Sequence, residues 1–379
     1  MNSICHFFSS SQSAYYFLNG QIQFMQENGV DLHIVVSFHE DIDVDKYPGI
    51  SFHFIPIVRA INLKKDFVAL LKLLSLFRQR KFDIIHLHTP KASLLGSLAA
   101  KLLLHKRIVY HLHGLVAIKN NNPIYGLTNL FERLPFLFSK HVLSVSQSMQ
   151  EYCITNKLVK RNKIQVLANG TINGIDGLNK FNPINASIIN FKTNFISSNK
   201  LENKFIVGFV GRICIDKGFF DFVNLANKLA IHSLNFTFLI VGGNELEQEV
   251  SVFLEQQAKF QYIHIDSTTN PENYIAMLNL LVLPSCREGF GLVVAEASAL
   301  QVPVVAYDIV GVRNAVVNEV TGKLVEAGNE DKLLKAVQFY YANPKVAKEH
   351  GECGRQFILS NFNPSNVWQE QLKFYKSIL

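Results

Sequence analysis

Two kinds of hydrophobic pattern alternate along the 379 residues of the chain. Short runs rich in β-branched and aromatic residues predict buried strands, and longer stretches with apolar residues every three or four positions predict covering helices. In the first half of the chain the predicted strands span residues 3–9, 31–38, 51–57, 82–88, 107–113, 141–146 and 163–168. Because helical stretches separate most of these strands, we expect a parallel sheet that is covered on both faces.

The pattern is lost in residues 170–203, an apparent inter-domain region rich in Asn, Ser and Gly, and it then resumes. In the second half the predicted strands span 205–211, 236–243, 262–265, 280–285, 302–307 and 322–327, and the predicted helices lie near 218–231, 245–259, 271–279, 290–300 and 330–343. We therefore expect an α/β chain with two Rossmann-like, doubly wound domains, residues 1–190 and 200–360. A C-terminal helix, 361–379, should pack back on the first domain. Because doubly wound sheets bind ligands at the carboxyl ends of their strands, we expect the site in a central crevice that both domains face.

The composition is that of a folded globular chain, with 48% hydrophobic and 18% charged residues. The best candidate for a membrane span, residues 94–104, is interrupted by Lys101, so no integral membrane segment is expected. The N-terminal segment lacks the charged region and cleavage site of a secretory signal, which predicts that the protein is not exported. The five cysteines have no metal-like spacing, and their odd number fits free thiols in a reducing cytoplasm.

The formal net charge of +7 allows three anionic partners: a nucleic acid, a membrane surface or a phosphate-bearing small molecule. The sequence contains neither interleaved basic and aromatic residues nor a helix-turn-helix pattern, so it does not support binding of a nucleic acid. Residues 61–82 combine an apolar helical stripe with six cations, Lys64, Lys65, Lys72, Arg78, Arg80 and Lys81. This segment fits either an ordinary covering helix with a charged outer face or a peripheral contact with an anionic membrane.

A candidate anion site follows the first strand of the second domain. That strand runs into Gly211 and Arg212, and Lys217 and Gly218 come next at a predicted helix start. Guanidinium, ammonium and backbone amide groups at such a place favour phosphate. A solvated basic loop that ends in a glycine cap remains the alternative.

The segment CREGFGLVVAEA, residues 286–297, predicts a second contribution to the same site. Gly289 and Gly291 let the backbone approach a ligand, and the helix that follows offers its positive N-terminal end to a diphosphate. Glu288 also fits an ordinary acidic residue at a helix start. Glu296 lies among small apolar residues, where an unpaired carboxylate is costly, so hydroxyl donors such as a ribose diol are its expected partners.

Several motifs together carry a family resemblance. GRICIDKG at 211–218, EGFGLVVAE at 288–296 and ALQVPVVAYDIVG at 299–311 resemble the C-terminal half of a glycosyltransferase of family 4 with the GT-B fold. In the first half HTPKASLLGSLAAKL at 88–102, YHLHG at 110–114, SVSQSM at 144–149 and LANGTINGID at 167–176 resemble bacterial capsule and O-antigen glycosyltransferases. The resemblance covers nearly the whole chain and is weakest at 1–60 and 180–200.

The resemblance implies a retaining glycosyltransferase that moves a sugar from a nucleoside-diphosphate donor, UDP-linked by expectation, to a hydroxyl of a lipid-linked saccharide. It implies no metal or other cofactor and a cytoplasmic enzyme on the inner face of the plasma membrane. Arg212 and Lys217 would bind the donor diphosphate, and Glu296 would hold the ribose. Glu288 would lie near the donor sugar, and His113 near the anomeric carbon on the acceptor side. The remaining donor-binding positions carried over are Gly211, Gly289, Phe290, Gly291 and Leu292.

Three features of the sequence fit more than one interpretation. Where many relatives have a glycine-rich loop, this chain has SSSQSAYYF at 9–17, so Ser10 and Ser11, with His88 and Lys91, are only candidate acceptor-side residues. His86-x-His88 and His111-x-His113 each put two imidazoles on one strand face; they fit a metal site, but an acceptor pocket with the other histidines satisfied in the sheet is favoured. Asp41-x-Asp43 and Asp43-x-Asp45 match a metal-binding DxD pattern, but the polar stretch before a Pro-Gly turn favours a solvated loop.

Two other functions remain as alternatives: a nucleotide-sugar hydrolase or epimerase of the same fold, and a non-catalytic module that binds saccharide or membrane. Incubation with donor alone separates the first from a transferase. Tolerance of changes at Arg212 and Glu296 marks the second.

Overall fold

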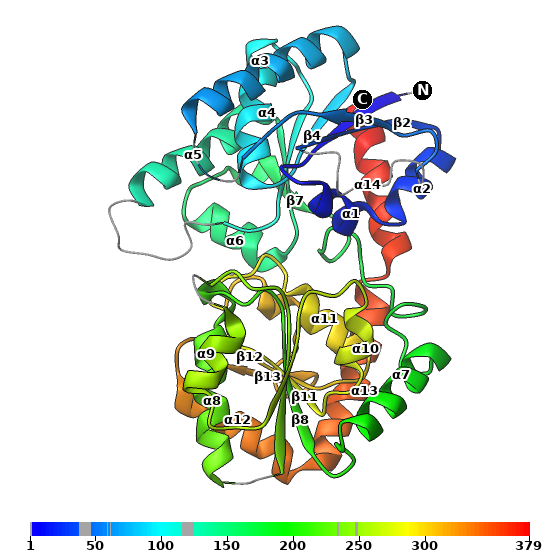
Figure 1. Cartoon of the computed structure of the whole chain (residues 1–379). Coiled ribbons are helices and arrows are strands. Elements are labelled where there is room, and N and C mark those ends of the chain that lie inside the picture. The colour runs from blue at the N-terminus through cyan, green and yellow to red at the C-terminus, as the bar shows by residue number, and fades with distance from the viewer. Residues whose placement is uncertain are drawn as a thin grey trace. The chain divides into compact units, whose positions relative to one another are not determined.

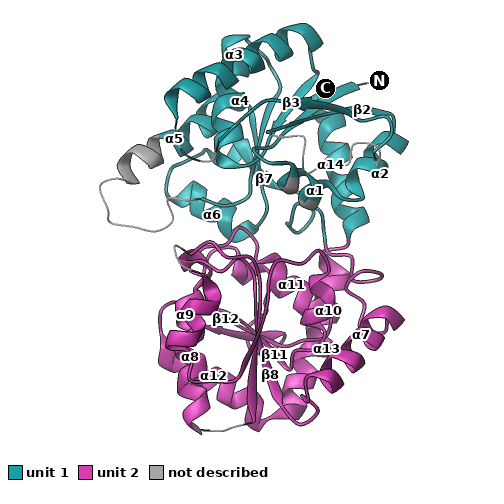
Figure 2. Cartoon of the chain, viewed as in Figure 1, with its two compact units in different colours: residues 1–174, 364–379 teal, residues 175–363 magenta. Residues whose placement is uncertain are grey.

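The computed structural model describes residues 2–37, 47–58, 60, 62–115, 125–232, 235–246 and 249–379. These residues form two compact units, unit 1 with residues 1–174 and 364–379 and unit 2 with residues 175–363 (Figure 2). The candidate DxD residues Asp41, Asp43 and Asp45 lie outside the described residues. Every described helix is too short or too polar to span a bilayer.

The boundary between the units differs from the expected one, because the Asn-rich stretch contains a helix. Helix α7 (Ala186–Ser198) begins at Asn185, whose side chain accepts a hydrogen bond from the amide of Ser187. Its Phe191 packs edge-on against Tyr274 of unit 2 at 5.2 Å between ring centroids. The helix therefore counts with unit 2, and the division falls at 174–175 rather than at 190–200.

Unit 1 is built on a parallel sheet whose seven strands are the seven predicted ones (Figure 1). The strands are β1 (Asn2–Phe7), β2 (Val30–Val36), β3 (Ser51–Phe54), β4 (Ile84–Leu87), β5 (Ile108–Leu112), β6 (His141–Ser144) and β7 (Ile164–Val166). Their order across the sheet is β3-β2-β1-β4-β5-β6-β7. The order reverses between β1 and β4, and such a switch point is where doubly wound sheets bind ligands.

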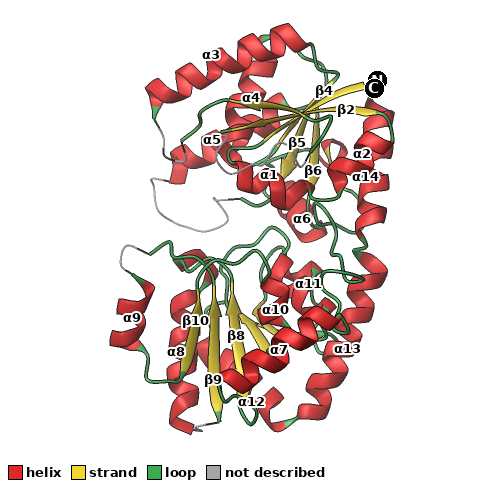
Figure 3. Cartoon of the chain, turned by 45° about the vertical axis from the view of Figure 1, so that its right-hand side comes forward, coloured by secondary structure: helices red, strands yellow, loops and turns green. Residues whose placement is uncertain are grey.

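Helices cover both faces of this sheet (Figure 3). They are α1 (Ser11–Leu18), α2 (Gln21–Glu27), α3 (Leu63–Arg80), α4 (Pro90–Leu102), α5 (Tyr125–Phe138), α6 (Gln147–Thr155) and α14 (Pro364–Ile378), with a 3-10 turn η3 (Arg161–Lys163). One core joins Ile4 and Phe8 of the β1 region to α1, α2 and α14, and a second core joins Cys5 and Phe7 to α3 and α4. The period of two along β1 thus sends alternate side chains into separate cores.

Unit 2 repeats the plan with the six predicted strands. These are β8 (Phe205–Val210), β9 (Phe236–Val241), β10 (Tyr262–Ile265), β11 (Leu280–Leu283), β12 (Val304–Tyr307) and β13 (Gly322–Val325), in the order β10-β9-β8-β11-β12-β13. Besides α7, the helical elements are η4 (Ile215–Lys217), α8 (Phe219–His232), α9 (Val250–Gln257), α10 (Pro271–Ile275), α11 (Leu292–Ala299), η5 (Val312–Asn314), α12 (Glu330–Ala342) and α13 (Pro344–Asn361). The switch point lies between β8 and β11. Two Rossmann-like parallel-sheet units confirm the predicted fold class, while the crevice between them stays a prediction.

Candidate functional site

The candidate site of unit 2 starts at the switch point of its sheet, where β8 and β11 end. After β8 the chain passes Gly211 and Arg212 and makes the turn η4, which ends at Gly218 in the left-handed region with φ +71°. A Cβ atom at Gly218 would lie 1.9 Å from the carbonyl oxygen of Pro284. Only glycine therefore lets the turn that carries Lys217 pack against the end of β11.

Lys217 is bound to a carboxylate from the neighbouring loop. Its Nζ lies 2.6 Å from Oε1 of Glu288, and the two side chains are 20% and 10% exposed. An ion pair that is shielded from solvent in this way is stronger than one in open solvent, because water competes less for either charge. The ion pair fixes the loop before α11 to the turn η4.

Two further cations of this region also have carboxylate partners. Arg212 forms an ion pair with Glu245 at 2.5 Å, and Arg287 pairs with Asp216 of η4. The sequence identified Arg212 and Lys217 as anion ligands but not the acidic residues that hold them. An incoming anion would have to share these cations with Glu245 and Glu288.

The loop before α11 brings backbone rather than side chains to the site. Gly291 precedes the helix with φ +79°, and no side chain caps the first turn. Phe290 is 3% exposed and packs edge-on against Phe362 at 4.9 Å, so it anchors the loop and can present only its backbone. A Cβ atom at Gly311 would lie 2.6 Å from the carbonyl oxygen of Glu288, which shows how closely a second loop supports this one.

Glu296 of α11 is the least satisfied charge of the region. Burial raises the pKa of its carboxyl group to about 7, an effect that Lys180 and Lys217 oppose and Glu272 reinforces. Lys180 lies 3.7 Å from Glu272, and the part of the chain that the structure describes provides no hydrogen-bond donor to Glu296. Sequence analysis predicted the isolated carboxylate but not its neighbours Lys180 and Glu272, which come from segments far away along the chain. The geometry favours a ligand that offers hydroxyl groups.

The candidate site of unit 1 is a cluster of histidines at the switch point between β1 and β4. His6 lies beside His86 in the register of these strands, and β5 adds His111 and, just beyond its end, His113. By the period of two, His6, His86 and His111 share the face with Ile4, Ile84 and Val109, which α1, α2 and α14 cover. The prediction that neighbouring strands bring the imidazoles together is confirmed, and His6 is the member that was missed.

The imidazoles are bonded to one another. His6 Nδ1 lies 3.0 Å from His88 Nε2, and His88 Nδ1 lies 3.0 Å from His113 Nε2. Burial lowers the pKa of His6 and of His113 to about 3 and that of His86, His88 and His111 well below the ordinary value. All five imidazoles are therefore neutral at pH 7. Two triplets, His6 with His86 and His88 and His88 with His111 and His113, have nitrogens within 4.8 Å of one another, close enough to consider a metal.

The other expected acceptor-side residues have structural partners. Lys91 Nζ donates to the carbonyl oxygens of Val58 and Ala60 and forms an ion pair of 2.7 Å with Asp66. Ser10 caps α1 by accepting from the amide of Ser13, and Ser11 is buried. Both nitrogens of His88 are bonded, so His88 can reach a ligand only through His113. His113 is half-buried, and its Nδ1 atom has no hydrogen-bond partner among the described residues.

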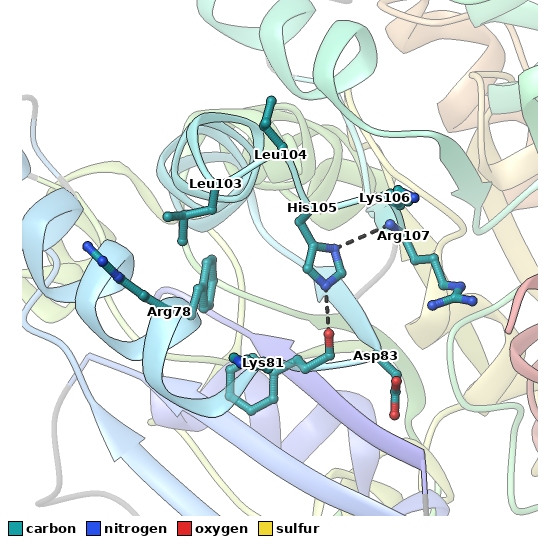
Figure 4. Close-up of a pocket in the computed structure, with 10 residues that line it drawn as sticks. Arg78, Lys81, Asp83, Leu103, Leu104, His105, Lys106 and Arg107 are labelled. Atoms are coloured by element: carbon teal, nitrogen blue, oxygen red, sulfur yellow. Dashed lines mark hydrogen bonds between the residues drawn. The ribbon is translucent and has the colours of Figure 1, made fainter.

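A pocket of about 390 Å³ lies in unit 1 at the opposite ends of the strands (Figure 4). Phe77, Phe82 and Leu103 form its apolar part, and Arg78, Lys81 and Lys106 line it as exposed cations. None of these three cations forms an ion pair with a residue that the structure describes. Arg107 is different, because its guanidinium donates to the carbonyl oxygen of Ile378 at 2.7 Å.

Comparison with protein families gives two matches. Residues 190–357 match the family described as "Glycosyl transferases group 1", and residues 20–171 match the one described as "Glycosyltransferase Family 4". Together they span both units.

Comparison with curated proteins gives relatives of similar length. The "Capsular polysaccharide biosynthesis glycosyltransferase CapM" of Staphylococcus aureus is 30% identical over 374 residues, which cover 96% of this chain and 94% of the relative. The "UDP-Gal:alpha-D-GlcNAc-diphosphoundecaprenol alpha-1,3-galactosyltransferase" of Escherichia coli is 27% identical over 319 residues, covering 82% and 79%. The crystal structure of HepE from Anabaena in complex with UDP-glucose matches all of this chain and all of its own, with a TM-score of 0.79 at 18% identity. That similarity shows the fold.

Proposed function

The chain belongs to the group 1 glycosyltransferases and is a glycosyltransferase with the GT-B fold, and from this premise we propose which sugar donor and which acceptor it uses. The donor is a nucleoside-diphosphate sugar, UDP-linked, and it binds to unit 2. The acceptor is a hydroxyl of a lipid-linked saccharide in the synthesis of a capsule, O-antigen or exopolysaccharide. The anomeric configuration is retained.

The observation that carries the donor proposal is the convergence of Lys217, Glu288 and Glu296 on the uncapped start of α11. The positive charge of Lys217 lowers the pKa of the Glu296 carboxyl group, against the larger effect of burial, and we propose that one ligand contacts both side chains. A nucleoside diphosphate offers what each group lacks: a charged diphosphate for the lysine and the amides, and ribose hydroxyls for the glutamate. HepE, which has the same fold, was crystallised with UDP-glucose, and this supports a UDP-linked donor.

The chemistry that these residues support is the departure of the nucleoside diphosphate. Negative charge grows on the leaving group in the transition state, and preorganised positive groups lower the barrier. Lys217, Arg212 and the amides of Gly291 and Leu292 supply that charge, so no metal ion is needed for it. Glu288 is held 2.6 Å from Lys217, and we propose that it contacts the transferred sugar.

The acceptor binds to unit 1, where the Nδ1 atom of His113 has no hydrogen-bond partner in the part of the chain that the structure describes. The name of the Escherichia coli relative specifies a diphosphoundecaprenol-linked saccharide, and this supports a lipid-linked acceptor. The name of the Staphylococcus aureus relative supports a role in a polysaccharide of the cell surface.

A lipid-linked acceptor calls for a contact with the membrane, and unit 1 has a suitable surface. Leu63, Phe67 and Leu71, spaced by four residues on α3, are 80%, 60% and 49% exposed. Arg78 continues this stripe into the pocket of Figure 4, where Leu104 on the far side is 80% exposed. Apolar side chains beside unpaired cations are what an anionic bilayer binds, so we propose peripheral attachment to the inner face of the plasma membrane through this surface.

A transfer assay tests the function. UDP-linked sugars are incubated with and without lipid-linked saccharides, and UDP release and saccharide extension are followed together. We expect rapid release of UDP only with acceptor, and extension in equal amount. Equal consumption of the donor without acceptor would instead indicate a hydrolase or epimerase of the same fold.

Vesicle co-sedimentation tests the membrane contact separately. We expect binding to vesicles that contain phosphatidylglycerol and little binding to phosphatidylcholine alone. Replacement of Phe67 and Leu71 by Ser should weaken binding, whereas Ile231→Ser, which removes an 80% exposed apolar residue from unit 2, should not. Unchanged binding of the first variant would contradict the assignment.

A further inference from the structure

A row of hydrogen-bonded side chains leads from the C-terminal helix α14 to His113. The hydroxyl group of Tyr375 lies 3.2 Å from His6 Nε2, and His6 and His88 continue the row to His113 in two contacts of 3.0 Å. Tyr375, His6 and His88 are all buried. We call these four residues the histidine row.

The rings of the row are held in place by aromatic neighbours. Phe8 stacks on His88 with centroids 4.1 Å apart and planes within 12°, and Phe17 stacks on His113 at 4.5 Å and 7°. Ring flips are therefore hindered, and each nitrogen keeps its partner. The row can change only by moving protons along its hydrogen bonds.

Neutral imidazoles make the row directional. Burial keeps the pKa of its histidines low, so each ring carries one N–H group and one lone pair. Along the histidine row every ring must therefore donate its hydrogen bond in the same direction. The direction of the hydrogen bond at Tyr375 then fixes the tautomer of His113 at the other end. The row thus has two states, and His113 carries its proton on Nδ1 in one and on Nε2 in the other.

Tyr375 is where the direction is decided. Its oxygen accepts from Nε2 of Gln371 at 2.7 Å, and its single proton goes either to His6 Nε2 or to His86 Nδ1, which lies 2.5 Å away. If the proton goes to His86, the other nitrogen of that ring, Nε2, must carry hydrogen. If the proton goes to His6, His86 donates from Nδ1 to the tyrosine oxygen, and Nε2 of His86 carries no hydrogen.

The surroundings of His86 favour the second state. His86 Nε2 is buried and has no hydrogen-bond partner among the described residues. A buried N–H group without an acceptor is rarer in proteins than an unfilled acceptor, so Nε2 is the less costly place for the lone pair. Tyr375 then donates to His6 Nε2, His6 Nδ1 donates to His88 Nε2, and His88 Nδ1 donates to His113 Nε2.

We propose that Tyr375 is a positioning residue that, through His6 and His88, fixes His113 as the Nδ1–H tautomer. The free nitrogen of His113 then offers a hydrogen-bond donor, not a base, to the reacting sugars. This part of the inference rests on the proposed function, because it places the substrates at His113. The tautomer itself does not depend on that function.

The test is nitrogen-15 NMR of the histidine rings in the full chain, without substrate, together with steady-state kinetics. We expect a protonated Nδ1 on His113 in the wild type and a mixture of tautomers in Tyr375→Phe. Tyr340→Phe is the matched control, because Tyr340 makes a similar buried bond of 2.7 Å to His350 in unit 2. The control should lose comparable stability and leave the signals of His113 unchanged.

The kinetic arm separates the two parts of the inference. Tyr375→Phe should lower kcat roughly tenfold with little change in the KM of the donor. A protein with the expected tautomer but no transfer activity would refute the proposed function alone. A protonated Nε2 on His113 in the wild type would overturn the proposal, as would stoichiometric binding of Zn²⁺ by the row, and the wild-type spectrum decides this even if Tyr375→Phe does not fold.

Discussion

Lys217 and Glu288 form an ion pair of 2.6 Å that joins the turn after β8 to the loop before α11. The pair connects the two segments that the switch point of the sheet brings together. Each partner therefore has a structural role beside the role proposed for it with the donor.

The double role of this pair predicts separate effects on stability and activity. Lys217→Ala leaves Glu288 largely buried without its partner and should lower the free energy of unfolding by about 2 kcal/mol and abolish measurable transfer. The double variant Lys217→Met with Glu288→Gln removes both charges and should recover most of the stability but none of the activity. Urea denaturation and the transfer assay measure the two effects.

The control for this prediction is Lys332→Ala, because the pair of Lys332 with Glu326 is exposed in both partners. It should change the free energy of unfolding by less than about 0.5 kcal/mol and leave transfer intact. Recovery of activity in the double variant would show that neither charge acts on the donor.

The carboxyl group of Glu296 should lower the free energy of unfolding of the ligand-free protein in a pH-dependent way. Its pKa rises on folding from 4.5 to about 7, so the stability associated with its protonated form is complete below pH 4.5 and is lost as the pH rises through 7. Glu296→Gln should therefore raise the free energy of unfolding of the ligand-free protein at pH 8 by up to about 3 kcal/mol and hardly change it at pH 4.5. The same variant should bind a UDP-sugar at least tenfold more weakly, because an amide is a poorer acceptor for ribose hydroxyls.

Calorimetry tests separately whether Glu296 binds the ribose. Hydrogen bonds from ribose hydroxyls stabilise the charged carboxylate, and the free carboxyl group is about half protonated at pH 7, so binding of a UDP-sugar there should release about half a proton in the wild type and none in Glu296→Gln. The heat measured in buffers of different ionisation enthalpy reports that proton. Equal release by both proteins would refute the assignment of Glu296 to the ribose.

The buried histidines predict sensitivity to acid. The pKa of His6 and of His113 falls on folding from 6.5 to about 3, and the pKa values of His86, His88 and His111 are also depressed. The stability that they contribute is present above pH 6.5 and is lost as the pH falls toward 3, because the unfolded chain binds protons there that the folded chain does not. Unfolding at pH 5 should take up about two protons through His6 and His113 and additional protons through the other three histidines, about 1.4 kcal/mol per pH unit for each proton. The pH dependence of urea denaturation checks this, and uptake below one proton would contradict the buried, neutral cluster.

Gly218 predicts a steric effect at the turn that carries Lys217. A Cβ atom there would collide with the carbonyl oxygen of Pro284, so Gly218→Ala should cost about 3 kcal/mol of stability and lower transfer activity. Gly328→Ala is the matched control, because Gly328 has a similar φ of +77° but no atom within 4 Å of the added carbon. It should cost about 1 kcal/mol from backbone strain alone. Equal losses in the two variants would show that the packing of the turn is not critical.

Periodicity in the sequence was sufficient to predict all thirteen described strands, because buried parallel strands are short apolar runs that contrast with their neighbours. Periodicity did not predict α7, because this segment is rich in Asn and Ser residues. An aromatic contact with Tyr274 stabilises the helix. The contact joins residues about eighty positions apart, and no local pattern indicates it.

The candidate site could be predicted only in part for the same reason. Gly218, Lys217 and Glu296 have local signatures: a glycine at a helix start, a cation beside it, and a carboxylate between alanines. The ion pair of Lys217 with Glu288 and the bond of Tyr375 to His86, 289 residues away, depend on tertiary structure. Lys91 was a candidate acceptor-side residue, and its hydrogen bonds to the carbonyl oxygens of Val58 and Ala60 have no sequence signal.

Unit 2 is proposed to bind a UDP-linked sugar through Lys217 and Glu296 for transfer to a saccharide. Isothermal titration of the full chain with UDP-sugars, in the wild type, Lys217→Ala and Glu296→Gln, tests it most directly. We expect one site per chain in the wild type, binding at least tenfold weaker in each variant, and unchanged binding in Lys332→Ala. Equal affinity in the wild type and both site variants would contradict it.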